Sequence, residues 1–176
     1  MSIDALLITG GPGSGKSSVA GALGTLLEVE GVRYGAIETE LLAWGWPWLT
    51  LEDSLPQLRC LVALQREAGR ELFLIIATTE SEAQLRGVLD AVQASRIQVV
   101  CLSAPAELAA QRVADREPDS WPGKAALVEH ARQLADVIPA LSGIDHVLST
   151  RDRSAPQVAA ELRELMFDRF GLRVRA

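Results

Sequence analysis

The sequence predicts an α/β fold in three layers, with helices on both faces of a five-stranded parallel sheet. Two observations lead to this class. Short apolar runs alternate along the chain with helical segments, the order that βαβ crossovers produce. These runs are apolar throughout rather than at every second residue, so each strand is expected to be covered on both faces. The 176 residues, 48% of them hydrophobic, suffice for the core of one domain, which we expect to span residues 1–176.

The strands are expected where an apolar run of strand length is bounded by polar or glycine residues. Five segments meet this description, at residues 4–9, 32–38, 71–78, 97–103 and 144–149. In a parallel sheet of this kind, ligands bind at the carboxyl ends of the strands. Functional residues are therefore to be sought directly after these five segments.

The helices are expected between the strands, at residues 17–31, 51–69, 81–94, 105–116, 124–141 and 155–170. Gly31 ends the first of them, whereas Pro56 works against a regular first turn in the second. Ser81 and Ser154 are suited to be N-caps, and Pro105 fits the first position of its helix. The remaining segments are expected to be loops.

Composition excludes several classes of function. The net charge of −6, from 17 basic and 23 acidic residues, argues against a general nucleic-acid binder. Cys60 and Cys101 show no metal-ligand spacing and are predicted to be buried thiols in a reducing, cytoplasmic environment. The short N-terminal apolar stretch does not fit a signal peptide, and no apolar segment is long enough to span a bilayer. We therefore expect neither a nucleic-acid nor a membrane partner.

The loop after the first strand matches the phosphate-loop (Walker A) pattern of Gly, four residues, Gly-Lys-Ser. Glycines let backbone N–H groups approach phosphate oxygens, and the start of the next helix adds its positive dipole end. Lys16 can reach the β- and γ-phosphates of a nucleoside triphosphate, and the Ser17 hydroxyl can bind Mg²⁺. The sequence therefore predicts an ATP and Mg²⁺ site, with nucleotide contacts from Gly10, Gly11, Pro12, Gly13, Ser14, Gly15, Lys16, Ser17 and Ser18.

Other phosphate-loop classes fit less well. A GTPase would carry an Asn-Lys-x-Asp guanine reader, which the sequence lacks. A motor-type or AAA-type ATPase would end its third strand in acidic residues, whereas this strand runs through Thr78 and Thr79 to the single Glu80. The chain is also too short for the additional helical domain of an AAA module.

The second strand ends in Glu38-Thr39-Glu40. Here the chain resembles the small-molecule kinases of the P-loop NTPase superfamily, such as shikimate, gluconate and adenylylsulfate kinases, which carry an acidic-x-acidic pair, usually Asp-x-Asp, at this point. The resemblance implies that Glu38 organises Mg²⁺ through water and that Glu40 orients or deprotonates the acceptor hydroxyl. The departure is Glu for Asp at both positions, and two solvated carboxylates at a strand end remain the alternative.

A second resemblance to these kinases is an arginine pair on the helix that leads into a lid. Arg112 and Arg116 are four residues apart and share a helix face. The resemblance implies that they contact the nucleotide phosphates and the charge that develops during transfer, with a short lid near residues 112–124. The alternative is a solvated helix face whose arginines pair with Glu107 or Asp115.

Two further segments carry weaker signals. In the resembled kinases the loop after the fifth strand borders the adenine, where Arg153 or Arg151 could stack on the base, although a charged surface loop fits equally. Trp44, Trp46 and Trp48 follow Glu40 within a few residues and are suited to an aromatic wall against the acceptor. An apolar plug under a loop and a partner surface are the alternatives for this cluster. Arg59, on the next helix, is a further candidate contact for an anionic acceptor.

The function expected from these features is an ATP-dependent kinase that transfers the γ-phosphate of ATP to a hydroxyl of a small molecule. Two alternatives remain from the sequence. One is a nucleotide-binding protein without efficient transfer, such as a sensor or a degenerate kinase, which the Glu-for-Asp changes favour. The other is a nucleoside-triphosphate hydrolase that acts with a partner. His130 and His146 match no metal or triad pattern, and His130 is expected on a helix surface.

Overall fold

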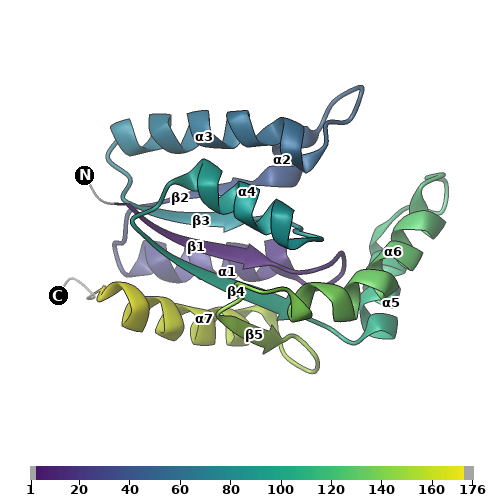
Figure 1. The fold of residues 1–176 in the computed structure, drawn as a ribbon. Helices are drawn as coiled ribbons and strands as arrows, with labels where there is room; N and C mark the ends of the chain where they lie inside the picture. The colour runs from purple at the N-terminus through teal and green to yellow at the C-terminus, as the bar shows by residue number, and fades with distance from the viewer. Residues whose placement is uncertain (1–2, 173–176) are drawn as a thin grey trace.

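A computed structural model describes residues 3–172, and its centre is one parallel β-sheet (Figure 1). The strands lie in the order β2-β3-β1-β4-β5, and every neighbouring pair is parallel. Their bounds are Asp4–Thr9 for β1, Tyr34–Glu38 for β2, Leu72–Ile76 for β3, Arg96–Ser103 for β4 and His146–Ser149 for β5. The predicted α/β class with five parallel strands is confirmed.

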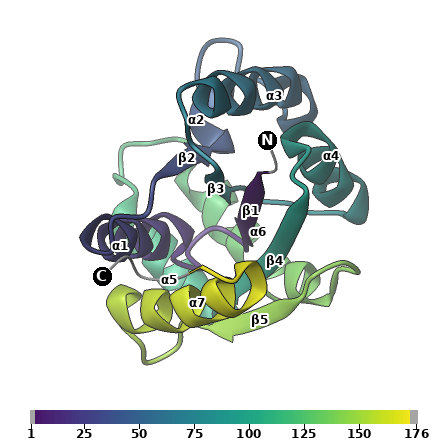
Figure 2. The same cartoon turned by 90° about the vertical axis from the view of Figure 1, so that its left-hand side faces the viewer.

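Helices cover both faces of the sheet. Their bounds are Lys16–Val29 for α1, Thr39–Ala43 for α2, Leu51–Glu67 for α3, Glu82–Val92 for α4, Ala106–Arg116 for α5, Lys124–Val137 for α6 and Ala155–Phe170 for α7. Figures 1 and 2 show α1 and α7 on one face and α3 and α4 on the other. Helices α5 and α6 form an arm beside the carboxyl ends of the strands (Figure 1).

The central strand β1 shows why both faces must be covered. Successive side chains of a strand point to opposite faces. Leu6 and Ile8 accordingly pack in the cluster under α1 and α7, whereas Ala5 and Leu7 pack in the cluster under α3 and α4. All four side chains are fully buried. This strand therefore leads rigidly from the core into the loop that follows Thr9.

The predicted helix caps at Ser81 and Ser154 are confirmed, whereas several helix boundaries differ from those predicted. The hydroxyls of Ser81 and Ser154 accept backbone N–H groups at the starts of α4 and α7, as predicted. Pro105 is the residue before α5 rather than its first residue. Helix α3 passes through Pro56 without a break, and Thr50 caps its start with Asp53 in a capping box.

Two expectations are wrong. The helix predicted at 124–141 ends at Val137, and Ile138–Ala140 continue as a short 3-10 helix around Pro139, which cannot donate the next helical hydrogen bond. Cys60 is exposed on α3 rather than buried, while Cys101 is buried as predicted. None of the described helices combines the length and the apolar character that a bilayer crossing needs.

Candidate functional site

The phosphate loop joins β1 to α1 and depends on glycine at two positions. Gly13 has a φ of 76°, and a β-carbon there would collide with the backbone carbonyl of Ala109 in α5. Gly10 has a φ of 144°, and a β-carbon there would collide with the carbonyl of Leu102 in β4. Both glycines are thus required by close backbone approach as well as by their dihedral angles.

The arm formed by α5 and α6 packs against this loop. A β-carbon on Gly11 would lie 3.3 Å from the β-carbon of Leu134, so α6 lies directly behind the loop. Arg112 of α5 donates from Nη1 to the carbonyl of Gly13 at 3.2 Å and to Oγ1 of Thr150 at 2.9 Å. Its Nη2 donates to the carbonyl of Thr150 at 2.9 Å. Arg112 therefore fastens the phosphate loop to the segment after β5, and its predicted phosphate contact stays a prediction.

Lys16 is the first residue of α1, and its side chain folds back over the loop. Its Nζ donates to the carbonyls of Gly10 at 2.8 Å and Gly11 at 3.3 Å. Burial lowers the pKa of Lys16, Arg116 lowers it further, and the carboxylates of Glu40 and Glu38 act to raise it. The ammonium therefore lies within electrostatic reach of three of the other predicted site residues.

Ser17 and Glu38 form the pair predicted for a metal ion. The Ser17 hydroxyl donates to Oε1 of Glu38 at 2.6 Å, which joins the first turn of α1 to the end of β2. Hydroxyl and carboxylate oxygens are ligands that Mg²⁺ accepts, with phosphates and waters completing its octahedron. The two residues fit Mg²⁺ bound in this way. Residues 3–172 hold no cluster of three or more His, Cys, Asp or Glu side chains placed for a metal ion.

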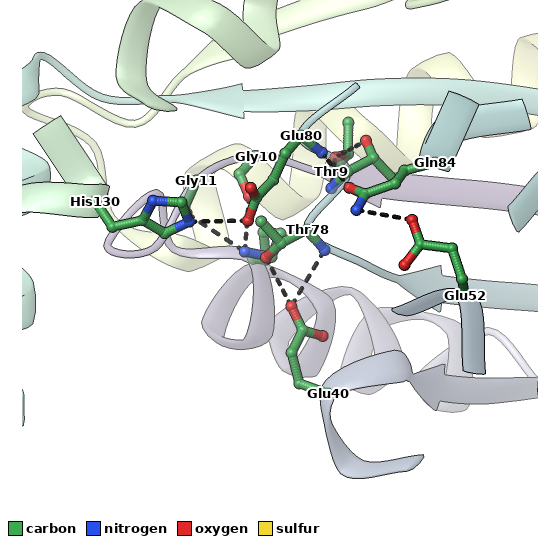
Figure 3. A network of polar contacts seen from close by, with 11 residues as sticks. Thr9, Gly10, Gly11, Glu40, Glu52, Thr78, Glu80, Gln84 and His130 are labelled. Carbon is green, nitrogen blue, oxygen red and sulfur yellow. Dashed lines mark hydrogen bonds and ion pairs between the residues drawn. The ribbon is translucent and has the colours of Figure 1, made fainter. Parts of the chain in front are cut away.

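Glu40 lies in α2, a one-turn helix that the sequence did not predict. Its Oε1 accepts the backbone N–H of Thr78 at 3.1 Å and the Thr78 hydroxyl at 2.7 Å (Figure 3). Its Oε2 accepts the Thr39 hydroxyl at 3.3 Å. Thr39 also donates to the carbonyl of Ile76, so α2 is fixed to the end of β3. Glu40 is consequently held beside the phosphate loop with Oε2 as its less occupied oxygen.

A chain of polar contacts crosses this edge of the molecule (Figure 3). Oε1 of Glu80 lies 2.8 Å from Nε2 of His130 in α6. The backbone N–H of Glu80 donates to Oε1 of Gln84 at 2.8 Å, and Nε2 of Gln84 donates to Glu52 at 3.1 Å. The chain therefore connects α3, α4, the end of β3 and the α6 arm. Sequence analysis missed His130 here, since no local pattern signals a partner 50 residues away.

The other predicted site residues that the structure describes outside the phosphate loop and the strand ends are exposed or partly exposed. Arg116 is exposed and pairs with Glu117 at 2.7 Å. Arg153 pairs with Glu161 of α7 at 2.6 Å, so its predicted contact with the base stays a prediction. Ser18 is exposed in the first turn of α1, and Arg59 is exposed on α3.

All four tryptophans of the chain are exposed. Trp44 is the C-cap of α2, and Trp46 and Trp48 follow it in the α2–α3 loop. Trp121 lies in the loop between α5 and α6. Their exposure argues against the alternative in which the cluster is a buried plug.

The structure combines a parallel sheet with a glycine-locked loop after its central strand, and Ser17 and Glu38 lie beside this loop. This is the fold of solved P-loop kinases. Solved structures share it over almost the whole chain. They include a gluconokinase from Sinorhizobium meliloti 1021 (21% identity, 94% of both chains, TM-score 0.61). A shikimate kinase from Acinetobacter baumannii in complex with shikimate matches with 17% identity over 94% of both chains and a TM-score of 0.57.

A third structure is the APS kinase CysC from Mycobacterium tuberculosis in complex with AMPPNP and APS. It has 20% identity, covers 93% of this chain and 97% of its own, and has a TM-score of 0.63. The predicted resemblance to shikimate, gluconate and adenylylsulfate kinases is thus confirmed for the fold. No protein-family model and no curated protein matches the sequence.

Proposed function

We propose that this chain is an ATP-dependent kinase that transfers the γ-phosphoryl group of ATP to a hydroxyl of a small molecule. The observation that carries the proposal is the 2.6 Å contact of Ser17 with Glu38 beside the phosphate loop. Glu40 lies two residues after Glu38 and is held by the Thr78 hydroxyl at the end of the neighbouring strand, β3. The kinase neighbours in the same fold support it. The acceptor hydroxyl would approach from the side of Glu40.

The proposed chemistry uses a few groups in distinct roles. The backbone N–H groups of the loop and the Lys16 ammonium hold the β- and γ-phosphates, for which Lys16 leaves the two loop carbonyls. Mg²⁺ on Ser17 and Glu38 would neutralise phosphate charge. As the acceptor oxygen bonds to the γ-phosphorus and the bond to the ADP oxygen breaks, Oε2 of Glu40 takes the hydroxyl proton. Arg116, in a lid near residues 112–124, would stabilise the charge on the transferred group.

One observation favours a second candidate, a nucleotide-binding protein without efficient transfer. Oε1 of Glu40 already accepts two hydrogen bonds from Thr78, so only one of the two carboxylate oxygens, Oε2, is left to accept the proton of an acceptor hydroxyl. In that case ATP would bind tightly and no acceptor would change its turnover.

The test measures ADP production from ATP and Mg²⁺ across a panel of small alcohols, together with the affinity for a non-hydrolysable ATP analogue. A kinase gives ADP that rises with one acceptor and an equal amount of phosphorylated product. Tight analogue binding with the same slow ADP release for every acceptor contradicts transfer and supports the second candidate. Acceptor-independent hydrolysis that a partner protein accelerates would support a hydrolase.

A further inference from the structure

We propose that the acceptor is a ring-bearing alcohol that also carries a protonated amine. The ring would rest on Trp44 or Trp46, and the amine would face the carboxylates at the ends of β2 and β3. This inference rests on the proposed kinase function and specifies its substrate class. It excludes acceptors whose ring carries a carboxylate, sulfate or phosphate.

The position of the tryptophans carries the first step. Helix α2 holds Glu40 in its first turn and ends at Ala43, and Trp44 is its C-cap, four residues after Glu40 and about 6 Å farther along the helix axis. The backbone N–H of Leu49 donates to the carbonyl of Ala43 at 3.1 Å, so the loop that carries Trp46 returns to the end of α2. The indoles are thereby tethered to the same short helix as the residue proposed to receive the hydroxyl proton.

The exposure of these indoles carries the second step. The exposed fraction of the four tryptophans runs from 42% at Trp121 to 98% at Trp46, whereas the core is filled by aliphatic residues and phenylalanine. Three exposed indoles within five residues of one loop are large apolar side chains of the kind that binding sites expose. Indole faces bind flat rings, and they bind cations better than any other side-chain ring does. A ring with an attached amine satisfies both preferences.

The charge of this side carries the third step. Residues 36–58 and 74–85, which supply α2, the indole loop, the start of α3 and the end of β3, contain no Lys, Arg or His. They contain six carboxylates, at Glu38, Glu40, Glu52, Asp53, Glu80 and Glu82. Within residues 3–172 none of the six forms an ion pair with Lys or Arg, and only Glu80 has a basic partner, His130.

Several carboxylates elsewhere on the molecule are ion-paired. Asp4, Glu30 and Glu161 each pair with an arginine at 2.6 Å. Arg59 and Arg86 directly follow the two acidic segments, and Lys16 interacts with Glu38 and Glu40 from the phosphate loop, but the six carboxylates outnumber these three basic side chains. The acceptor side therefore carries an excess of negative charge, which disfavours an anionic acceptor and favours a cationic one.

Four of the six carboxylates are free of a proposed catalytic role, since Glu38 is assigned to Mg²⁺ and Glu40 to the hydroxyl. Asp53 is held in the capping box of α3, and Glu52 and Glu80 are linked to each other through Gln84, so we assign Glu52 and Glu80 to the amine. A hydrogen bond from its own backbone and one from Gln84 lower the pKa of Glu52, which keeps its carboxylate ionised. The contact from Gln84 also ties Glu52 to the Glu80 segment (Figure 3).

The first experiment measures binding to the intact protein with a non-hydrolysable ATP analogue and Mg²⁺. Because all four tryptophans lie on the two projecting loops, intrinsic fluorescence reports this surface directly. The probes are two matched series: glucosamine, glucose and glucuronate, then 4-(aminomethyl)benzyl alcohol, 1,4-benzenedimethanol and 4-(hydroxymethyl)benzoate. The amine is expected to bind about tenfold more tightly than its neutral partner in at least one series. Equal or tighter binding of the neutral or carboxylate members, or no binding in either series, overturns the proposal.

The second experiment uses calorimetry on variants. Trp44→Ala or Trp46→Ala should weaken amine binding about fivefold and leave the affinity for the ATP analogue unchanged. Leu64→Ala is the matched control, since Leu64 is an exposed apolar residue farther along α3 and should change neither affinity. Glu52→Gln should lower the affinity for the amine and leave the affinity for the neutral ring alcohol unchanged. The proposal fails if neither tryptophan variant differs from Leu64→Ala, provided that all three melt like the wild type.

The outcomes separate this inference from the proposed function. If only a carboxylate acceptor is phosphorylated, the kinase stands and the acceptor class is wrong. If amines bind and no acceptor raises ADP production, the kinase is wrong and the ligand class stands. If tryptophan emission shifts with protein concentration as the sedimenting mass doubles, a second copy of the chain covers the indoles and the acceptor proposal is overturned.

Discussion

The candidate site has a nucleotide side, formed by the phosphate loop at residues 10–17, and an acceptor side, formed by residues 36–58 and 74–85. Different interactions hold these two sides in place. On the nucleotide side, backbone packs against backbone: Gly13 lies against the carbonyl of Ala109, and Gly10 lies against the carbonyl of Leu102. On the acceptor side, side-chain hydrogen bonds such as that of Glu40 with Thr78 fix a one-turn helix, and the following loop ends in exposed indoles. The nucleotide side is thus shaped before any ligand arrives, whereas the acceptor side leaves its apolar surface to be covered by one.

Because the two sides are held by different interactions, substitutions on them should have different effects. A change on the nucleotide side should damage nucleotide binding, and where it disturbs packing it should also lower stability. A change on the acceptor side should alter turnover or acceptor affinity while the fold and the nucleotide affinity survive. Four substitutions test the separation, taken from the largest expected effect to the smallest.

Lys16→Ala removes the only lysine of the phosphate loop. We expect kcat/KM to fall by about 10³-fold, since the charge on the transferring phosphates loses its nearest cation. Steady-state ADP production and affinity for an ATP analogue measure the loss. Arg66→Ala is the control, because Arg66 is an exposed basic residue in the last turn of α3, at the opposite end of that helix from the α2–α3 loop. Equal activity of the two variants would remove Lys16 from the mechanism.

Gly13→Ala tests the backbone packing. A side chain at a φ of 76°, directed at the carbonyl of Ala109, should cost about 3 kcal/mol of unfolding free energy and disrupt nucleotide binding. Denaturant unfolding and analogue binding give the two values. Gly21→Ala, in the exposed middle of α1 with open space around it, should instead stabilise the protein slightly. A stable Gly13→Ala protein that binds ATP normally contradicts the packing account.

Glu40→Gln tests the acceptor side with little change of shape. The amide still accepts from Thr78 and cannot take a proton, so acceptor-dependent kcat should fall about 10²-fold while the affinity for ATP stays the same. Glu38→Gln provides the contrast, because it should raise the Mg²⁺ concentration needed for activity. A Glu40→Gln enzyme with wild-type transfer would exclude Glu40 as the base.

The same contrast explains what the sequence could predict. The sheet, the phosphate loop and the caps at Ser81 and Ser154 depend on residues close together in the chain, so their patterns are local. Helix α2 could not be predicted because five residues carry too little periodicity, and its position depends on hydrogen bonds to β3. Two of the three hydrogen bonds that Glu40 accepts also come from Thr78, which follows the end of a different strand, β3.

Arg112 makes contacts that the sequence did not indicate. The resemblance to small-molecule kinases implied a phosphate contact, which stays a prediction, and its partners in the structure are the carbonyls of Gly13 and Thr150 and the hydroxyl of Thr150. An arginine on a helix face can meet either kind of acceptor, and the one-dimensional pattern does not distinguish them. The contact of Glu80 with His130 is of the same kind, since only the fold brings α6 to the end of β3.

His130→Gln tests the contact that joins the two sides. Because His130 is 38% exposed and Glu80 is 42% exposed, their coupling in a double-mutant cycle with Glu80→Gln should stay below about 1 kcal/mol. The same cycle for Arg132 and Glu107, also on the α6 arm, provides a matched surface pair. The acceptor KM should nevertheless rise in His130→Gln and stay constant in Arg132→Gln, because His130 contacts Glu80 whereas Arg132 pairs with Glu107 and Glu129 within the arm. A large coupling energy with an unchanged acceptor KM would contradict this expectation. The contact of His130 with Glu80 would then stabilise the fold, as the packing on the nucleotide side does, and would not position the acceptor.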